Sequence, residues 1–415
     1  MIKYFETEKL LSLNYKFKHM NIKNCLTILF VIFITAASHA FQKKQKPGDN
    51  STQELINKLP RQIYWEEGKF HVQGVVVDTQ RGYVYFSFTT SLVKTNLKGE
   101  IIGSVDGFVG HLGCLDVNPE DGRIYASLEY KNDKIGKGIL KGLGDESKQI
   151  QQSSFHIAII DGDKITRQGM DAEKDNIVNT VYIKEAVDDY LATVTNKSKQ
   201  VEHRYGCSGI DGVAFGPQFG KKKDGKLFLK VAYGVYGETS RSDNDYQVIL
   251  QYDANTLKQY ERPLSQSNFS LAGPEKPLNK YFVYTGNTSY GIQNMEYDSN
   301  TGYWFAAVYK GKKQEFPNYS LFAIDGAKKP ALKELKGFDE KEKGQVLQLA
   351  KAGMHDEKSG VYGWNFKWGA TGIHSLGNGY FYISQNGVTK SKKQYCKLQL
   401  YRWTGQESNP FEEVK

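Results

Sequence analysis

The sequence predicts an all-β protein, and within that class a five-bladed β-propeller. Three observations predict it: a composition suited to turns and strands, a glycine-led strand motif that recurs five times, and a partner strand before each copy. The 415 residues include 41 glycines, 27 tyrosines and 22 phenylalanines but only 10 prolines, which favours turn-rich β structure. With 39% hydrophobic and 24% charged residues the chain can bury a core, which excludes a disordered or collagen-like protein.

The repeat is a glycine turn followed by an aromatic-rich strand, as in GYVYFSF at residues 82–88. Its copies begin at Gly82, Gly122, Gly225, Gly302 and Gly379. A first strand precedes each copy and begins at a triplet centred on Gln73, Gly113, Asp211, Gln293 and His374. Third strands are expected at 91–96, 155–161, 246–253, 319–325 and 395–401, and fourth strands at 101–105 and 179–183. Five such antiparallel units are typical of a propeller.

The spacing of the repeats is uneven. The glycines are separated by 40, 103, 77 and 77 residues, so the second gap needs an insertion. The helical periodicity of residues 185–194 predicts a helix there, and a hidden sixth blade is the architectural alternative. Residues 59–65 are expected to pair with the last blade and close the ring.

The N-terminal segment predicts export. Residues 26–37 are apolar apart from two threonines, follow Lys23 and precede Ser38-His39-Ala40, which is typical of a secretory signal with its cleavage site. The apolar run is too short to span a bilayer. We therefore expect a signal peptide at 1–40, with Met20 as a possible true start, a polar linker at 41–58 and the propeller at 59–415. The mature protein is expected to be secreted or periplasmic, monomeric and free of the membrane.

The cysteine content bears on disulfides, and the net charge bears on the class of ligand. Cys114, Cys207 and Cys396 are too few for a disulfide framework and are expected as buried thiols, with a bridge between the first two as the alternative. The formal charge of +9 comes from scattered lysines without an arginine-rich stripe, which argues against nucleic acid and allows an acidic ligand. A carbohydrate, neutral or acidic, is the expected partner.

Propeller topology places the segments that lead into the inner strands, and the second-to-third connections, on one face. Acids and bases on that face are the candidate catalytic residues: Glu129, Glu238, His203, Arg204 and Asp211. Polar and aromatic neighbours are the candidate substrate-binding residues: His71, His111, Asp133, Tyr205, Arg241, Asp245, Tyr290, Gln293, Trp364, Trp368 and His374. The five triplet centres are expected to ring the channel, where their side chains can hold water or a structural calcium ion; no other cofactor or metal is expected.

Two chemistries fit these residues. Paired carboxylates are what glycoside hydrolysis needs, whereas histidine, tyrosine and arginine suit β-elimination of a uronate. Each acid also has a purely structural interpretation: Glu129 can pair with Lys131 or Arg204, and Arg241 can brace a loop with Asp243 and Asp245. No nucleophile elbow, phosphate loop or zinc-protease motif is present.

Four segments, 127–133, 203–212, 241–247 and 368–373, resemble blocks of a family of secreted bacterial β-propellers whose members are mainly uncharacterised. That resemblance implies a fold and a compartment. The five-bladed layout is more remotely similar to arabinanase-type glycosidases and calcium-dependent nucleotidases. In the arabinanase type an aspartate on the first blade is the base, whereas this chain has His71 and Gln73 there.

The sequence thus predicts a secreted carbohydrate-active protein with its site at the channel mouth. A glycoside hydrolase or polysaccharide lyase is the leading hypothesis, although the residues leave open whether the protein is an enzyme. The alternatives are a non-catalytic propeller that binds a glycan or a protein, and a calcium-dependent phosphohydrolase.

Overall fold

The computed structural model describes residues 49–415 except 68–69, 146–149, 151 and 222–224. The predicted signal peptide and most of the predicted linker lie outside the described residues. Residues 49–58 of that linker form helix α3 (Asp49–Lys58). Every described strand belongs to one compact unit, Ile56–Lys415. Within the described residues, none of the helices has both the length and the apolar character needed to cross a bilayer.

Five mainly antiparallel sheets correspond to the five predicted blades. Blade one contains β2 (Val72–Asp78), β3 (Tyr83–Phe88), β4 (Ser91–Asn96) and β5 (Ile101–Asp106), with β9 (Met170–Asp171) added in parallel at its edge. Blade two contains β6 (His111–Val117), β7 (Ile124–Tyr130), β8 (Ser154–Ile160), β10 (Val178–Tyr182) and β16 (Arg262–Pro263). Blade three contains β13 (Cys207–Pro217), β14 (Leu227–Val235), β15 (Tyr246–Tyr252), β17 (Asn279–Tyr284), β22 (Lys343–Val346) and β21 (Ala331–Glu334).

The C-terminal part of the chain forms the remaining two blades, and β1 from the N-terminal part joins the last of them. Blade four contains β18 (Thr288–Asp298), β19 (Tyr303–Lys310) and β20 (Leu321–Asp325). Blade five contains β25 (Ile373–Gly377), β26 (Tyr380–Val388), β27 (Gln394–Trp403), β1 (Gln62–Glu67) and β28 (Phe411–Glu413). Two short hairpins form sheets of their own: β11 (Thr193–Asn196) with β12 (Lys199–Glu202), and β23 (Met354–Asp356) with β24 (Val361–Gly363), of which β24 contacts β20 of blade four.

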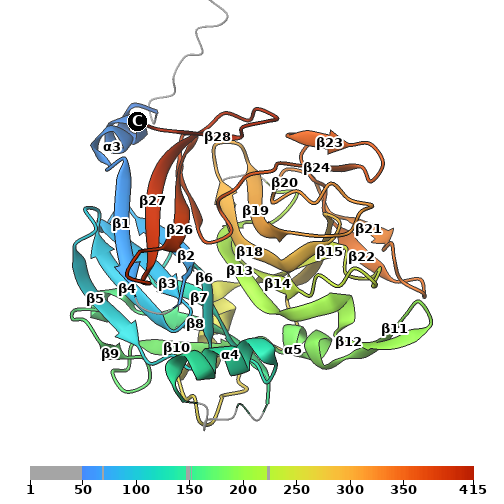
Figure 1. Ribbon diagram of the computed structural model, residues 1–415, viewed down its shortest axis with the longest axis horizontal. Helices are drawn as coiled ribbons and strands as arrows, with labels where there is room; N and C mark the ends of the chain where they lie inside the picture. The colour runs from blue at the N-terminus through green and yellow to red at the C-terminus, as the bar shows by residue number, and fades with distance from the viewer. Residues whose placement is uncertain (1–48, 68–69, 146–149, 151, 222–224) are drawn as a thin grey trace, which may run out of the picture. The chain divides into compact units, whose positions relative to one another are not determined.

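The inner strands form a closed ring. Strand β2 contacts β6, β6 contacts β13, β13 contacts β18, β18 contacts β25, and β25 contacts β2. Figure 1 shows β2, β6, β13 and β18 near the centre of the ribbon, with β5, β9 and β21 at the periphery. The five-bladed prediction is confirmed, and the described residues contain no sixth blade.

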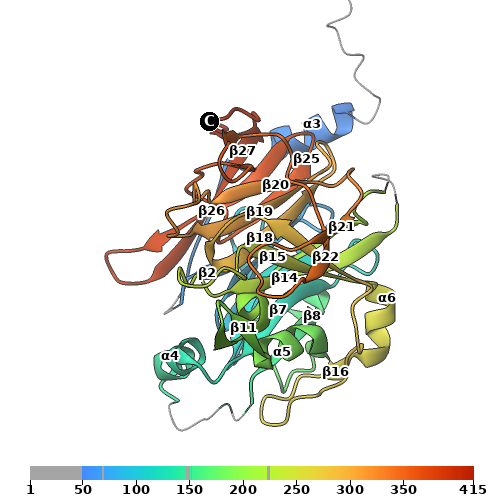
Figure 2. The ribbon, with the colours of Figure 1, turned by 90° about the vertical axis from the view of Figure 1, so that its right-hand side faces the viewer.

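An insertion fills the long gap between the second and third repeats. It holds α4 (Lys134–Leu143), α5 (Lys184–Leu191) and the β11–β12 hairpin. The predicted helix is α5, which packs against β8 and β13 beside blades two and three (Figure 2). Helix α4 was not predicted. It begins because the Asp133 side chain accepts hydrogen bonds from the backbone N–H groups of Ile135 and Gly136, and it ends at the left-handed Gly144.

Large aromatic side chains fill the spaces between blades. Phe215 of blade three meets Tyr125 of blade two edge-on, with ring centroids 5.1 Å apart. Phe305 of blade four meets Phe381 of blade five in the same way at 5.4 Å. All four side chains are buried, so the aromatic-rich repeat supplies the hydrophobic contact between neighbouring sheets.

Strand β1 closes the ring by pairing with β27. The antiparallel register runs from Gln62 opposite Gln399 to Glu67 opposite Gln394. Side chains alternate across the sheet, so Ile63 is 1% exposed whereas Tyr64 is 44% exposed. The predicted closure is confirmed, with the strand shifted a few residues towards the C-terminus.

The three described cysteines are buried and free, as predicted. Burial raises the pKa of both Cys114 and Cys396 to about 12, so these thiols stay protonated at neutral pH.

Inner strands of blades one to four share an irregularity at the positions that the sequence aligned. Their register shifts at Gln73, at Gly113-Cys114, at Asp211-Gly212 and at Gln293. Such a β-bulge leaves an unpaired residue and redirects its side chain. In blade five the shift falls later, between Ser375 and Gly377, and His374 pairs regularly with Tyr382. His374 is therefore not equivalent to the other four triplet centres.

Blade three contains a buried lysine without an acidic partner among the described residues. Lys230 is fully buried, and its Nζ lies 5.0 Å from the Trp304 ring and 5.5 Å from the Phe219 ring. Its single described hydrogen bond is donated to the carbonyl oxygen of Pro217 at 3.3 Å. Burial lowers the pKa of Lys230 far below its usual value.

We predict that Ile63→Ala lowers the free energy of unfolding by about 2–5 kcal/mol, because it opens a cavity at the sheet that closes the ring. Urea unfolding measures the loss. Tyr64→Ala, on the exposed face of the same strand, is the control and should cost less than about 1 kcal/mol. Equal losses in both variants would contradict the role of the β1–β27 interface in the core.

We predict that Lys230→Met stabilises the protein, and that the gain grows as pH falls from about 10 towards 7. As the pH falls below about 10, the unfolded wild-type chain takes up a proton at this lysine before the folded chain does, because burial lowers the pKa of Lys230 in the folded state, so folding becomes less favourable. Urea unfolding at several pH values measures the gain. Lys226→Met, at an exposed position of the same hairpin, should show no such pH-dependent gain. A loss of stability in Lys230→Met would contradict the prediction.

Candidate functional site

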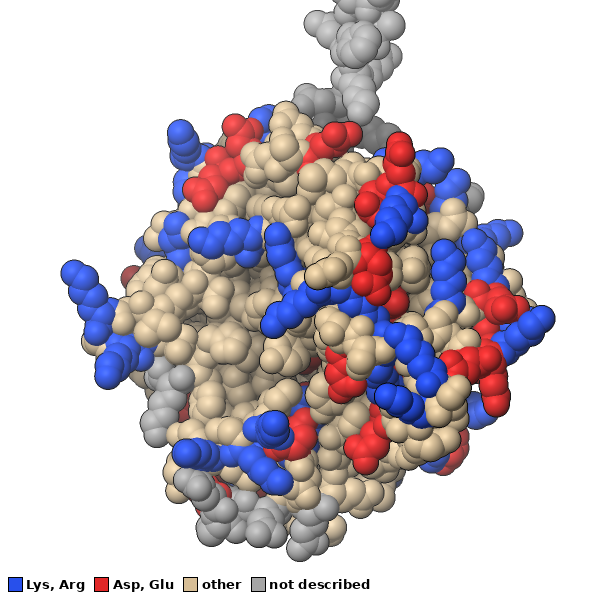
Figure 3. All heavy atoms as spheres, turned by 45° about the vertical axis from the view of Figure 1, so that its right-hand side comes forward, with Lys and Arg blue, Asp and Glu red and all other residues tan. Residues whose placement is uncertain are grey.

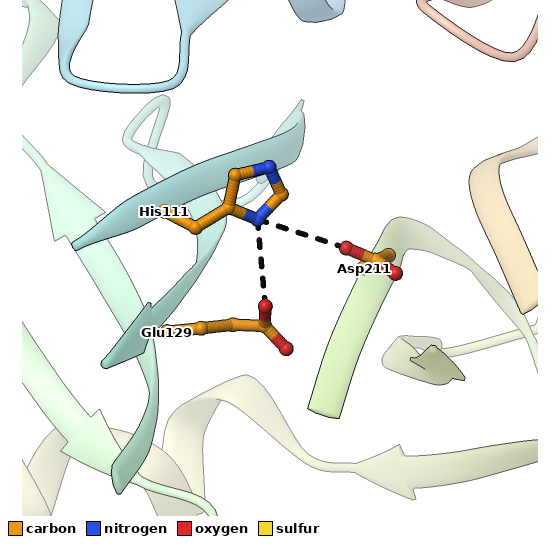
Figure 4. A group of neighbouring side chains, drawn as sticks. All are labelled: His111, Glu129 and Asp211. Carbon is orange, nitrogen blue, oxygen red and sulfur yellow. Dashed lines mark ion pairs between the residues drawn. The ribbon is translucent and has the colours of Figure 1, made fainter. Parts of the chain in front are cut away.

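Three predicted site residues meet at the mouth of the channel, where blades two and three adjoin. His111 starts β6, Glu129 lies near the end of β7, and Asp211 lies in the bulge of β13. His111 Nδ1 lies 3.4 Å from Glu129 Oε2 and 3.8 Å from Asp211 Oδ1 (Figure 4). We call these three residues the mouth cluster.

Glu129 is the buried carboxylate of the mouth cluster, and its contacts fix its position. Its side chain is 1% exposed; Oε1 accepts a hydrogen bond from the Ile210 backbone N–H at 2.5 Å, and Oε2 lies 2.8 Å from Lys131 Nζ. Position 209 must be glycine, because its φ is +131° and a Cβ there would lie 1.7 Å from Glu129 Oε1. Burial raises the pKa of Glu129, but Lys131 and His111 outweigh it and the net pKa is lowered. Glu129 is thus a fixed anion.

Lys131 supplies the compensating charge. It is 5% exposed, and Nζ also donates to the carbonyl oxygen of Ser208 at 3.0 Å. Burial lowers the pKa of Lys131, but Glu129 and Asp211 outweigh it and raise the pKa above its usual value. The structural pairing of Glu129 with Lys131 is therefore confirmed.

Asp211 is the carboxyl group of the mouth cluster that lacks a lysine or arginine partner among the described residues. Oδ2 accepts a hydrogen bond from Gln293 Nε2 at 3.0 Å. Burial, and secondarily the negative charge of Glu129, raise the pKa of Asp211 to about 7. Near neutral pH both protonation states of Asp211 are accessible, which is what acid–base chemistry requires.

His111 is placed to exchange protons with Asp211. Its Nδ1 is buried and has no hydrogen-bond partner among the described residues, and it faces the two carboxylates. The second ring nitrogen points away from both of them (Figure 4). His71 lies nearby: burial, and then His111, lower the pKa of His71, whose Nε2 is 3.2 Å from Gln73 Nε2.

An aromatic pocket adjoins the mouth cluster through Tyr309. Burial and the nearby Asp211 raise the pKa of Tyr309 to about 12. The pocket has a volume of about 250 Å³, and its lining includes Tyr309, Lys310, Phe366, Lys367, Trp368 and Asn386. Predicted residue Tyr290 is 49% exposed and meets the Tyr309 ring edge-on at 6.2 Å. Tyr309 therefore links Asp211 to a pocket that blade four forms with the segment before blade five and with Asn386 of β26.

Three predicted catalytic residues lie outside the mouth cluster. His203 packs against Tyr190 and Tyr236, and its Nδ1 donates to the carbonyl oxygen of Tyr190 at 2.5 Å. Arg204, in the single turn η2 (Arg204–Gly206), lies 3.7 Å from Asp189. Glu238 is exposed on the β14–β15 connection.

Several predicted binding residues have structural contacts instead. Asp133 caps α4 and accepts a hydrogen bond from the Tyr236 hydroxyl at 2.8 Å. Tyr205 is buried and donates to Glu342 at 2.8 Å. Trp364 is 1% exposed, so its ring presents no face to a ligand.

The acidic loop after β14 is held by ion pairs, in line with the structural interpretation of Arg241, Asp243 and Asp245. Arg241 pairs with Asp243 at 2.8 Å and donates to the carbonyl oxygens of Glu202 and His203. Asp245 pairs with Lys313 at 2.6 Å. Both pairs are buried, so these charges hold the loop rather than face the channel mouth.

The five triplet centres were predicted to ring the channel, but their side chains do not meet at one place. Gly113 has no side chain, and His374 lies with Asp116 and Glu296 rather than with Asp211. Sequence analysis named neither of these acids, nor Tyr309, as site residues. Asp116 lies five positions after His111, and Glu296 lies three positions after Gln293. Their place on predicted inner strands is the one sequence feature that would have identified these two acids.

Charges on the face shown in Figure 3 are mixed. Lysines and arginines lie among aspartates and glutamates around a largely uncharged, hollowed area, without a continuous basic stripe.

Comparisons with known proteins add little. No known protein family matches the chain, and no curated protein matches it. Among solved structures, the one titled "Structure of Dos1 propeller" is similar over 84% of this chain and 85% of that chain, with 7% identity and a TM-score of 0.26. At that level the likeness carries no argument. The propeller assignment stands on the strand pairing, and a relation to the bacterial propeller family or to arabinanase-type enzymes is not shown.

We predict that Glu129→Gln lowers the free energy of unfolding by about 3–5 kcal/mol, because it leaves the buried Lys131 ammonium without a counter-charge. Urea unfolding measures the loss. The double variant Glu129→Gln with Lys131→Met should recover at least half of it, since neither charge remains. A double variant as unstable as the single one would show that shape rather than charge determines the loss.

Proposed function

We propose that the protein is a polysaccharide lyase that cleaves an acidic, uronate-containing glycan at the mouth cluster. The observation that carries the proposal is that Glu129 has both oxygens engaged, which leaves Asp211 and His111 as the reactive pair. Hydrolysis with two free carboxylates would need a second acid, and the mouth cluster offers none. One carboxyl group with a pKa of about 7 beside one imidazole supports elimination better.

The reaction balances with these two groups. The outward-facing nitrogen of His111 takes the proton from the carbon next to the uronate carboxylate. Protonated Asp211 gives its proton to the leaving glycosidic oxygen as the carbon–oxygen bond breaks and a carbon–carbon double bond forms. The imidazolium then gives its Nδ1 proton to the Asp211 carboxylate across the 3.8 Å between Nδ1 and Oδ1. Exchange of protons with water moves the remaining imidazole proton from the outward nitrogen back to Nδ1 and completes the cycle. No oxidant, reductant or further reactant is needed.

The aromatic pocket supports the substrate class. A flat ring such as that of Trp368 suits the apolar face of a sugar. Lys310 and Lys367 suit its carboxylate, and they line the same pocket. A secreted enzyme of this kind would meet such polymers outside the cell, in keeping with the signal peptide that the sequence predicts.

We expect the purified protein to release unsaturated uronate ends from at least one acidic glycan, detected by the ultraviolet absorbance of the new double bond. Neutral glycans serve as comparison substrates and should give no such product. Asp211→Asn should lower the turnover rate at least 100-fold while it still binds the glycan, because an amide donates no proton to the leaving oxygen. Glu238→Gln, at the exposed position outside the mouth cluster, is the control and should keep the full rate.

Two results would contradict the proposal. One is the absence of unsaturated product from every acidic glycan tested; a thermal shift with a glycan but no turnover would then favour the glycan-binding alternative. The other is an undiminished rate in Asp211→Asn.

A further inference from the structure

A second group of ionisable side chains lies deeper in the channel. Asp116 of β6, Glu296 of β18 and His374 of β25 come from the inner strands of three blades. One ligand atom from each lies within 4.8 Å of the other two, and His374 Nδ1 is 3.7 Å from Glu296 Oε1. Asp116 lies five positions after His111 on β6, so the two residues are roughly 15 Å apart along the strand. This inner cluster is thus distinct from the mouth cluster.

Backbone hydrogen bonds hold the two carboxylates in place. Asp116 Oδ2 accepts from the Phe215 N–H at 2.7 Å, and Oδ1 accepts from the Val117 N–H at 2.7 Å. Glu296 Oε1 accepts from the Ser375 N–H at 2.9 Å. Glu296 is 8% exposed, and within the described part of the chain its other oxygen, Oε2, accepts no hydrogen bond. One oxygen of this largely buried residue therefore takes part in no described hydrogen bond and is available for a ligand in the channel.

The inner cluster also lacks a positive side chain. No lysine or arginine among the described residues forms an ion pair with Asp116 or Glu296. In the mouth cluster the buried Lys131 has that role for Glu129. Two carboxylates this close repel each other in a buried site unless a cation or a shared proton lies between them.

A cavity gives access from the end of the channel opposite the mouth cluster. It has a volume of about 300 Å³, and Asp116 and His374 line it together with the β2–β3 and β6–β7 turns. Asp78, Glu120 and Asp121 add carboxylates to the same lining, where Arg81 pairs with Asp78, and Arg123 and Lys258 pair with Asp121. The approach is polar and wide enough for a hydrated ion.

We propose that Asp116, Glu296 and His374 bind one divalent metal ion in the channel. Two carboxylate oxygens and one imidazole nitrogen suit an ion that accepts both donor types, such as Mn²⁺ or Zn²⁺. Bonds of about 2.0–2.2 Å bring ligand atoms to about 3–3.5 Å from one another, so side-chain rotations close the remaining gap. The ion would join blades two, four and five, and it takes no part in the reaction proposed for the mouth cluster.

The test uses the mature protein after treatment with EDTA and removal of the chelator. Mn²⁺, Zn²⁺ and Ca²⁺ are added separately, the thermal midpoint is measured, and the bound metal is counted by elemental analysis. At least one ion should bind at one per chain and raise the midpoint by several degrees. Glu296→Gln keeps the shape and an acceptor for Ser375 but removes a charge. It should lose the metal-dependent rise, while its midpoint without metal should equal or exceed that of the wild type.

Asp211→Asn is the matched control, because it makes the same kind of change in the mouth cluster and should keep the metal-dependent rise. If Glu296→Gln does not fold, Asp116→Asn replaces it. The proposal is overturned if none of the three ions raises the wild-type midpoint, or if the rise persists in the inner-cluster variant. Neither result depends on whether the protein cleaves a glycan.

Discussion

The hydrogen bond from the Ile210 backbone N–H to Glu129 determines where the site can form. It connects the second strand of blade two to the inner strand of blade three at the bulge that carries Asp211. The contact needs a glycine at position 209 and a buried lysine at 131, so two further residues depend on one carboxylate. Burial raises the pKa of the neighbouring Asp211, and the negative charge of Glu129 raises it further. A structural anion thereby helps to set the protonation of the group next to it.

The channel brings buried acids together at two levels, with different means of compensation. At the mouth a lysine from the same strand as Glu129 balances one acid, and burial keeps the other partly protonated. In the inner cluster the described residues offer backbone N–H groups but no cationic side chain. Lys131 directly follows β7 and reaches Glu129, whereas Arg81, which lies in the lining of the deeper cavity, pairs with Asp78 instead.

Sequence analysis predicted the blades because each repeat combines a turn glycine with aromatic residues that must be buried. It also found Asp211 and Gln293, since both occupy the bulge that the repeat alignment marks. Sequence analysis grouped His374 with these two residues because a repeat alignment does not show where a strand bulges. In blade five the bulge comes two residues later. The roles of Tyr205, Asp245 and Trp364 depend on partners 68 or more residues away or on packing between sheets, which spacing along one chain does not reveal.

The pairing of β1 with β27 also bears on how the protein folds. The first strand of the ring to be synthesised finds its partner only when the last blade has left the ribosome. Until then Ile63 and its neighbours lack the sheet that buries them, and the chain must avoid pairing that edge with another molecule. Contacts between such distant segments form slowly, because a long loop must close first. Ring closure should therefore be a late step of folding, and an unfinished chain should be prone to aggregation.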